Sequence, residues 1–254
     1  MNSLKLANTI TQIARTAGDL IMTYYDGEID IELKADASPV TVADRVANQL
    51  IVEALTRLTP HIPIIAEESV TGDEKPEDLS EFWLVDPLDG TKEFIKKNGD
   101  FTVNIALIRA GTPVLGVVHP PVHGTAYIAT GEKQALLEDR QGHRQVISAR
   151  VMQLEHPTVV VSRSHRSLET EAFLDRFPSF NDVACGSSLK FCVIASGGAD
   201  LYPRLGRTME WDTAAGHAVL NAAGGRVETL GGQPLVYGKR GLDNPHFIAW
   251  GRDN

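Results

Sequence analysis

One short stretch, Trp83-Leu-Val-Asp-Pro-Leu-Asp-Gly-Thr-Lys-Glu-Phe94, constrains this chain more than any other. It begins as an apolar run of the length and composition typical of a buried strand. The run stops at Asp86, because Pro87 has no N–H to donate to a sheet. We therefore expect Asp86 and Asp89 to leave the end of a strand on a tight turn, with the carbonyl of Leu88 between them.

The groups on this predicted turn are suited to binding a metal ion and a phosphate. Two carboxylates and a backbone carbonyl are the hard oxygen ligands that Mg²⁺ takes. Gly90 has no Cβ, so a ligand can approach the main chain there. We expect the N–H groups of Gly90, Thr91 and Lys92 to face an anion, as a nest or the start of a helix. An ordinary type I turn stays open as the alternative, because Asp and Pro favour its first two positions.

Two further motifs accompany the stretch, and the three together identify a family. Ile64-Ile-Ala-Glu-Glu-Ser69 lies upstream, and Trp211-Asp-Thr-Ala-Ala-Gly-His217 lies downstream. With Asp86-Pro-Leu-Asp-Gly-Thr91 they resemble the signatures of the inositol monophosphatase superfamily of Mg²⁺-dependent, lithium-sensitive phosphatases, over nearly the whole chain. Three details are similar to its branch of bacterial 3'(2'),5'-bisphosphate nucleotidases: Asp-Gly-Thr-Lys-Glu-Phe at 89–94, Gly186-Ser-Ser-Leu-Lys-Phe-Cys192, and Leu201-Tyr-Pro-Arg204.

The resemblance implies a site that holds two Mg²⁺ ions, with a third and weaker position. The implied metal ligands are Glu67, Asp86, the Leu88 carbonyl, Asp89 and Asp212, with Asp44 at the third position. The implied catalytic residues are Glu67, Asp89 and Thr91. Glu67 and Thr91 align a water molecule for in-line attack on phosphorus, so no covalent phosphoenzyme is needed. The implied substrate contacts are Glu67, Leu88, Asp89, Gly90, Thr91, Asp212, Lys190 and Arg204.

Several of these residues also have an ordinary structural interpretation. Thr41-Val-Ala-Asp44 matches a capping box at the start of a helix. Asp212 suits an N-cap, and Thr91 suits a cap of the turn. Glu67 suits a surface position after a strand. Lys34, which the resemblance places ahead of the Thr-x-x-Asp motif that contains Asp44, suits a solvated position. The sequence alone leaves both interpretations open for each residue.

The resemblance also implies the substrate, 3'-phosphoadenosine 5'-phosphate, which is a by-product of sulfate assimilation and is cleaved to AMP and phosphate. One alternative is another phosphatase of the superfamily, acting on inositol 1-phosphate or fructose 1,6-bisphosphate. A second is a non-catalytic metal- or nucleotide-binding protein with the same fold. The metal motif contacts only the scissile phosphate, so we expect specificity to lie in residues 162–165, 186–190 and 201–210.

The composition of the chain limits which binding partners and which cellular location we expect. A net charge of −9 argues against nucleic-acid binding, which needs a basic surface. It is compatible with a small anionic substrate, because divalent cations in a carboxylate cluster reverse the local charge. Two cysteines, Cys185 and Cys192, form no disulfide framework, and no signal or transmembrane pattern is present. We expect a cytoplasmic monomer or homodimer. The resemblance to the nucleotidase branch implies, as the alternative, peripheral attachment to the cytoplasmic face of the inner membrane.

Hydrophobic periodicity predicts a layered α/β (α+β) sandwich in two halves. In residues 1–150, helices are expected at 6–24 and 42–58 against a mostly antiparallel sheet. The expected strands of this half are 29–33, 62–66, 82–85, 101–108, 114–118, 126–129 and 135–137. In residues 151–254 strands alternate with helices, as in a smaller α/β unit. Its expected strands are 158–161, one near 183, 199–202 and 226–228, and its helices are 168–177, 188–196 and 213–223. We expect the halves to pack closely, with the site in the cleft between them.

Overall fold

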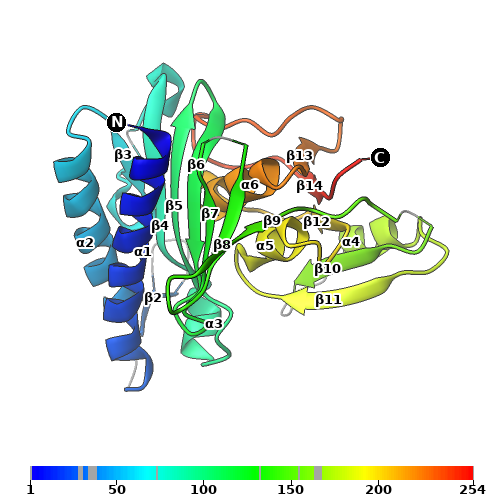
Figure 1. Ribbon diagram of the computed structural model, residues 1–254, viewed down its shortest axis with the longest axis horizontal. Helices are drawn as coiled ribbons and strands as arrows, with labels where there is room; N and C mark the ends of the chain where they lie inside the picture. The colour runs from blue at the N-terminus through cyan, green and yellow to red at the C-terminus, as the bar shows by residue number, and fades with distance from the viewer. Residues whose placement is uncertain are drawn as a thin grey trace.

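The computed structural model describes residues 2–27, 31–33, 39–72, 74–131, 133–153, 155–162 and 168–253. Helices and sheets alternate in layers (Figure 1). Helices α1 (Ser3–Tyr25) and α2 (Val42–Leu58) cover one face of a seven-stranded sheet. Helices α5 (Leu189–Ala195) and α6 (Glu210–Ala222) lie between this sheet and a five-stranded one. The short helix α4 (Leu168–Leu174) packs on the outer face of the second sheet.

The large sheet is buried on both faces. Its strand order is β3-β4-β5-β6-β7-β8-β9, with β3 parallel to β4 and every other pair antiparallel. The strands are β3 (Ile64–Ala66), β4 (Glu81–Asp89), β5 (Thr102–Arg109), β6 (Thr112–His119), β7 (Ala126–Ala129), β8 (Ala135–Glu138) and β9 (Arg144–Ile147). On β4, Trp83 and Val85 face the α1–α2 layer, whereas Phe82 and Leu84 face the α5–α6 layer. Burial on both faces explains why β4 reads as a continuous apolar run rather than an alternating one.

The small sheet has the order β11-β10-β12-β14-β13. Its strands are β10 (Thr158–Ser162), β11 (Asn181–Cys185), β12 (Leu201–Arg204), β13 (Arg226–Thr229) and β14 (Phe247–Trp250). β10 pairs in parallel with β11 and β12, and β14 pairs antiparallel with β12 and β13. The remaining elements are β1 (Ile31–Leu33), β2 (Pro39–Thr41), the short helix α3 (Thr91–Ile95), and the 3₁₀ turns η1 (Glu67–Ser69) and η2 (Pro76–Asp78).

The first two helices form as their sequences predict. Leu6, Ile10 and Ala14 recur on the buried side of α1, and Asn2 caps its start by accepting the Leu4 N–H at 2.8 Å. Thr41 precedes the first residue of α2 and caps it in the predicted capping box.

Helix α6 lies directly against the large sheet because one position on β6 has no side chain. A Cβ on Gly116 would lie 2.7 Å from the Ala215 carbonyl oxygen and 2.8 Å from the Cβ of Ala218. Any larger residue at position 116 would push α6 away from β6. The start of α6 is therefore fixed relative to the strands of the large sheet.

The observed layers agree with the predicted fold class, and several boundaries differ. β12 lies two residues later than the strand expected at 199–202, α6 begins three residues before the helix expected at 213, and β2, β9 and β14 were not predicted. Positions 29 and 30 of the expected strand 29–33 are outside the described residues. The division near residue 150 stays a prediction, because the core between the two sheets includes residues from both halves. Among the described residues, no helix is both long and apolar enough to cross a membrane.

Candidate active site

The end of β4 is a β-bulge rather than the expected tight turn. The strand does not stop at Asp86 but continues to Asp89. Asp86 pairs with Asn104 and Asp89 pairs with Thr102, so β4 has one more residue than β5 between these two pairs. Pro87 has no partner in the register with β5, so its missing N–H costs no ladder hydrogen bond. The Asp86 side chain accepts the Leu88 N–H at 3.0 Å and closes a local turn within the strand.

Three aspartates meet at this bulge. Asp86, Asp89 and Asp212 each offer a carboxylate oxygen, and these oxygens lie within 4.8 Å of one another. The first two come from β4, and Asp212 comes from the first turn of α6. The fixed contact between α6 and β6 therefore brings residues distant in sequence into one cluster.

Glu67 joins the cluster through strand pairing. β3 is parallel to β4 with Ala66 opposite Val85, so the next residues, Glu67 and Asp86, leave neighbouring strands together. Their side chains share a hydrogen bond. The predicted position of Glu67 beside the first aspartate is thus observed, on the η1 turn that follows β3.

The acidic cluster has a large electrostatic cost in the absence of cations. Burial raises the pKa of Asp86 well above its usual range, and the charges of Glu67, Asp89 and Asp212 raise it further. Burial, with the charges of Asp89 and Glu67, raises the pKa of Asp212 to about 8, although the Met209 N–H and the charge of Arg204 oppose the shift. Carboxylates that raise one another's pKa in this way fit divalent cations that prefer oxygen ligands, and the Leu88 carbonyl lies on the same bulge.

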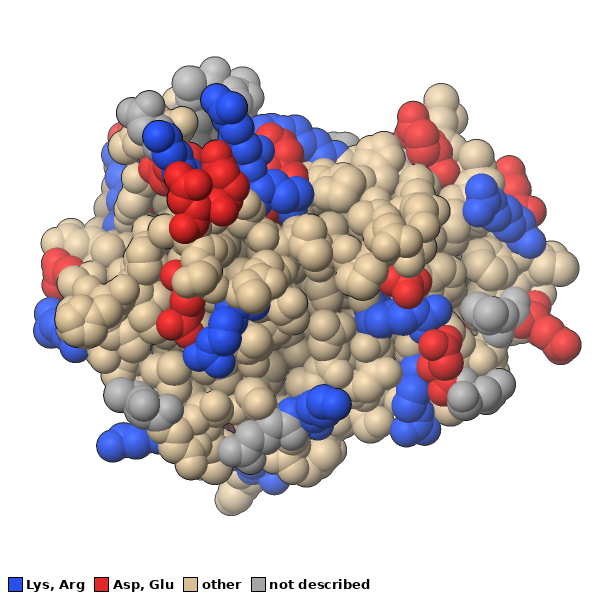
Figure 2. Space-filling view, turned by 90° about the horizontal axis from the view of Figure 1, so that it is seen from above, with Lys and Arg blue, Asp and Glu red and all other residues tan. Residues whose placement is uncertain are grey.

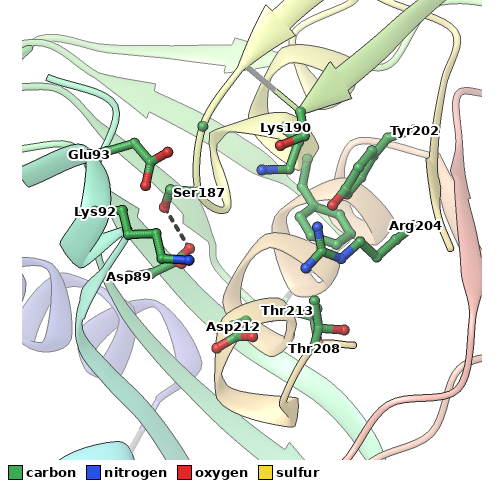
Figure 3. A pocket seen from close by; sticks show the side chains of 14 residues that line it. Asp89, Lys92, Glu93, Ser187, Lys190, Tyr202, Arg204, Thr208, Asp212 and Thr213 are labelled. Atoms are coloured by element: carbon green, nitrogen blue, oxygen red, sulfur yellow. Dashed lines mark hydrogen bonds between the residues drawn. The ribbon is translucent and has the colours of Figure 1, made fainter. Parts of the chain in front are cut away.

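Asp89 is held by the segment that precedes α5. Its Oδ2 accepts a hydrogen bond from the Ser187 hydroxyl at 2.5 Å (Figure 3). It also accepts the Ser188 N–H at 2.7 Å and the Asn104 amide N–H at 3.3 Å. Sequence reasoning placed residues 186–190 among the specificity segments and missed their contact with a proposed metal ligand. The Gly-Ser-Ser sequence at 186–188 was the available signal, but which acid it contacts depends on the fold.

Asp44 and Thr91 lie together at the edge of the cluster. The Oδ2 of Asp44 accepts the Thr41 N–H at 2.7 Å and the Thr41 hydroxyl at 2.6 Å, so the predicted capping box is present. The Oδ1 of Asp44 accepts the Thr91 hydroxyl at 3.2 Å. Both carboxylate oxygens of Asp44 therefore accept hydrogen bonds from the protein. Asp44 lies outside the group of three aspartates. Its role as a ligand of a third metal stays a prediction.

Thr91 opens the short helix α3 directly after a residue in the left-handed conformation. Gly90 has φ of +95°, which a glycine adopts without strain. The Phe94 N–H donates to the Gly90 carbonyl at 2.9 Å and closes the first turn. In an α-helix the N–H groups of this first turn have no partner inside the helix. The predicted helix start is observed, and the binding of an anion there stays a prediction.

Asp212 is not an N-cap, in contrast to the structural alternative drawn from its sequence. The N-cap of α6 is Met209, and Asp212 follows it by three residues, accepting the Met209 N–H at 2.8 Å. Asp44 occupies the same position on α2. Both acids thus stabilise the first turn of a helix, and of the two only Asp212 belongs to the group of three aspartates.

The cluster opens into a pocket of about 170 Å³ that also contains cationic side chains. Asp89 and Asp212 lie on one side, and Lys190 and Arg204 lie across from them with Tyr202 (Figure 3). Lys190 is buried, and its Nζ lies 5.4 Å from the centre of the Tyr202 ring. Further lining residues are Gly90, Lys92, Glu93, Ser162, Gly186, Ser187, Phe191, Thr208 and Thr213. An adjoining pocket, lined by Glu67, Thr91 and Thr208 among others, shares Asp89 and Asp212 with the first.

Residues 163–165 of the predicted specificity segment 162–165 fall outside the described residues, and so does Lys34. Tyr202 and Thr208 belong to the predicted segment 201–210, but their place in the pocket was not predicted individually.

Comparison with known proteins indicates the same family as the motifs do, over nearly the whole chain. The model of the inositol monophosphatase family matches residues 3–251. The 3'(2'),5'-bisphosphate nucleotidase CysQ of Escherichia coli (strain K12) is 48% identical over 245 residues, which are 95% of this chain and 98% of that protein.

Solved structures agree with the sequence comparison. The crystal structure of CysQ from Bacteroides thetaiotaomicron, described as a bacterial member of the inositol monophosphatase family, is 36% identical with a TM-score of 0.86, covering 99% of this chain and 98% of that one. An inositol monophosphatase from Zymomonas mobilis is 27% identical with a TM-score of 0.77, covering 98% of this chain and 92% of that one. With the motifs, the layers and the acidic cluster in agreement, this chain belongs to the inositol monophosphatase family.

Proposed function

We propose that this protein is a Mg²⁺-dependent phosphatase that hydrolyses the 3'-phosphate of 3'-phosphoadenosine 5'-phosphate to AMP and phosphate. The observation that carries the proposal is one pocket with an acidic cluster on one side and two cationic side chains, Lys190 and Arg204, on the other. The name of the 48% identical relative, 3'(2'),5'-bisphosphate nucleotidase, supports the same substrate class.

The residues of the cluster have distinct parts in the proposed reaction. Asp86, Asp89, Asp212, Glu67 and the Leu88 carbonyl would hold the divalent cations. When bound, such cations lower the pKa of a water molecule and neutralise charge on the phosphate oxygens.

The hydroxyl of Thr91 has its proton directed at Asp44, at 3.2 Å, which leaves its lone pairs to orient an attacking water. Glu67 lines the same pocket as Thr91 and would accept a proton from that water. The N–H groups of Gly90 and Thr91, at the start of α3, would donate to the phosphate oxygens.

The far side of the pocket is suited to a second anionic group. Lys190 is buried, and among the described residues no carboxylate forms an ion pair with it. A buried ammonium group is costly without an anionic partner. Arg204 lines the same region, so a substrate with one phosphate at the aspartates and another near these cations would complement both sides.

A phosphate-release assay tests the proposed function. The assay compares 3'-phosphoadenosine 5'-phosphate, inositol 1-phosphate and fructose 1,6-bisphosphate, each with Mg²⁺ and with EDTA. We expect the highest kcat/KM for the nucleoside bisphosphate and no turnover in EDTA. Preference for either of the other substrates would assign a different phosphatase activity, and no turnover of any phosphate ester would favour a non-catalytic binding protein.

Replacing either cationic side chain, Lys190 or Arg204, is expected to weaken binding of the nucleoside bisphosphate. A hydrogen bond to a charged group contributes about 1.5–3 kcal/mol, or about ten- to a hundredfold. Lys190→Ala and Arg204→Ala are each expected to raise KM for 3'-phosphoadenosine 5'-phosphate by about that factor. The measurement is steady-state kinetics on this substrate and on adenosine 3'-phosphate, which lacks the second phosphate. Equal losses on the two substrates would contradict a contact with the second phosphate.

Lithium ions are expected to inhibit the enzyme at millimolar concentrations. The reason is the oxygen-only cluster of Glu67, Asp86, Asp89 and Asp212, which accepts small hard cations. A single positive charge neutralises less of the cluster than Mg²⁺ does, so Li⁺ would occupy a position without supporting turnover. The measurement is initial rate against LiCl concentration at fixed Mg²⁺, with NaCl as the control. Equal rates in LiCl and NaCl would place this enzyme outside the lithium-sensitive group.

Partners and location follow from the sequence and stay predictions. Figure 2 shows Lys and Arg side chains interspersed with Asp and Glu on one face of the molecule. We propose a small phosphorylated molecule rather than a nucleic acid as the partner, a cytoplasmic location, and a monomer or homodimer.

A further inference from the structure

The first turn of α6, which carries Asp212, is hydrogen-bonded to a segment that comes much later in the chain. This segment, residues 236–244, lies in the connection between β13 and β14. It contacts the backbone and side chains of residues 208–213, on both sides of the point where α6 begins. Asp212 and Thr208 border the pocket here (Figure 3). The 236–244 segment therefore contacts the part of the backbone from which Asp212 reaches the acidic cluster.

Two successive peptide groups link Asp212 to Asn244. The first peptide carries the Thr208 carbonyl, which accepts the Asn244 N–H at 2.9 Å. The N–H of this same peptide belongs to Met209 and donates to the Asp212 carboxylate at 2.8 Å. The carbonyl of the second peptide, also of Met209, accepts the side-chain amide of Asn244 at 2.8 Å. Because a peptide group is planar, fixing its carbonyl also fixes the direction of its N–H. Asn244 thus sets the direction of the N–H that holds Asp212.

Asn244 is itself held by a buried ion pair. Lys239 donates from Nζ to the Oδ1 of Asn244 at 3.3 Å and to the Glu210 carboxylate at 2.6 Å. Glu210 is the first residue of α6, and its side chain is fully buried. Its carboxylate also accepts the N–H groups of Gly238 at 2.7 Å and Lys239 at 2.9 Å. Hydrogen bonds between charged groups are stronger than neutral ones, so these contacts join the 236–244 segment firmly to the helix start.

We propose that the side chains of Lys239, Glu210 and Asn244 are positioning groups for the metal site. They hold the carboxylate of Asp212 where a divalent cation can bind it together with the other two aspartates of the cluster. None of the three is among the residues that line the two pockets, so they act through Asp212 and not on the substrate. This inference rests on the part of the proposed function that assigns Asp212 to a cation.

Calorimetric titration of the metal-free protein with MgCl₂ tests the assignment without turnover. Lys239→Met removes the ammonium group and keeps most of the side-chain length. We expect it to raise the Kd of Mg²⁺ about tenfold, the lower end for a group that orients a metal ligand. Lys239→Arg keeps the charge and is expected to retain most of the affinity. Asn244→Ala leaves the ion pair in place, is expected to raise Kd by a similar factor, and keeps the test decisive if Lys239→Met does not fold.

Arg150→Met is the matched control, because Arg150 pairs with a carboxylate in the same kind of environment. The Asp200 side chain is fully buried and accepts two hydrogen bonds from the Arg150 guanidinium, at 2.8 and 2.5 Å. It also accepts two backbone N–H groups, as Glu210 does. Asp200 precedes β12, at the opposite end of that strand from Arg204 and the pocket. Arg150→Met and Lys239→Met are both expected to lower Tm in EDTA, since each leaves a buried carboxylate without its cation. Only Lys239→Met is expected to weaken Mg²⁺ binding.

A double variant shows whether Lys239 acts through Asp212. In the Asp212→Asn protein, Lys239→Met is expected to weaken Mg²⁺ binding no further, because the ligand that it would misplace is already lost. The readout is the rise in Tm from EDTA to MgCl₂, which reports binding to the folded state. A further loss as large as that of Lys239→Met alone would show that Lys239 acts independently of Asp212, and would overturn the inference.

Two other results would overturn the inference while leaving the proposed function standing. One is wild-type Mg²⁺ affinity in both Lys239→Met and Asn244→Ala. The other is an equal loss of affinity in Arg150→Met, which would attribute the effect to lower stability alone. A wild-type protein that binds no Mg²⁺ would instead overturn the proposed function, and the inference with it. A wild-type protein that binds Mg²⁺ but releases no phosphate from any ester would overturn the proposed activity alone.

Discussion

Asp212→Asn is expected to lower kcat/KM for phosphate release at least about a thousandfold, which corresponds to about 4 kcal/mol of transition-state stabilisation. Asp212 is the acid that α6 contributes to the cluster, within 4.8 Å of Asp86 and Asp89. Asparagine keeps the shape and can still accept the Met209 N–H, so the helix start is preserved. The substitution removes the negative charge that would hold a cation. Steady-state kinetics with Mg²⁺ measures the loss.

The same variant is expected to be as stable as the wild type, or more stable, in EDTA. In the folded, metal-free protein the pKa of Asp212 is raised to about 8 from an ordinary value of 3.8. Between these pH values the folded state binds the proton more tightly than the unfolded chain, so the wild type loses stability as pH rises. Asparagine cannot ionise, so the advantage of the variant is expected to be small near about pH 4 and largest above about pH 8. Thermal unfolding across this range tests the sign.

Addition of Mg²⁺ provides a readout that does not depend on turnover. A ligand that binds only the folded state raises Tm, so Mg²⁺ is expected to stabilise the wild type more than Asp212→Asn. Asp175→Asn, which changes an exposed acid just after α4, is the matched control and is expected to behave as the wild type. An active Asp212→Asn enzyme would exclude the ligand role. A variant that unfolds readily in EDTA would make Asp212 a structural residue of the α6 start.

Thr91→Val is expected to lower kcat about a hundredfold, the low end for a group that positions proton transfer, with a smaller change in KM. Valine fills the same space but cannot orient a water molecule. Thr91→Ser retains the hydroxyl and is expected to keep most of the activity. Equal kcat values for Thr91→Val and the wild type would show that the hydroxyl has no part in the reaction.

Asp44→Asn, combined with Thr91→Val, decides between the two roles open to Asp44. If Asp44 acts by orienting the Thr91 hydroxyl, which it accepts at 3.2 Å, the double variant is expected to be no slower than Thr91→Val. If Asp44 holds a third metal, the two losses are expected to multiply, and the single variant is expected to require more Mg²⁺. Initial rates over a range of Mg²⁺ concentrations distinguish these outcomes. An unchanged Tm of Asp44→Asn would show that the helix cap with Thr41 is retained.

The sequence was most informative where chemistry and local pattern coincide. The motifs around Glu67, Asp86 and Asp212 indicated the family, and the structure brings these acids together as expected. The apolar runs predicted most strands of the large sheet, because a sheet covered on both faces needs apolar residues at successive positions. The helices α1 and α2 followed from the spacing of their buried residues, and α2 also from its capping box.

Local pattern failed where the backbone departs from regular geometry. Pro87 predicted the end of a strand, but β4 passes through it because a bulge places the residue outside the ladder. A bulge depends on how the neighbouring strand pairs, and that pairing is not written in the local residues. The structural alternative for Asp212, an N-cap, was also wrong, because α6 begins earlier, at Glu210.

By itself, the sequence determined the family, the acids of the cluster and the order of most elements, because these depend on residue type and short-range spacing. Only the tertiary structure decided what those acids contact. The hydrogen bonds from Ser187 and Ser188 to Asp89 join segments far apart in the chain, and so does the contact from Thr91 to Asp44. The hydrogen bonds from Asn244 to Thr208 and Met209 were also invisible in the sequence, since they form only where the chain folds back onto the start of α6.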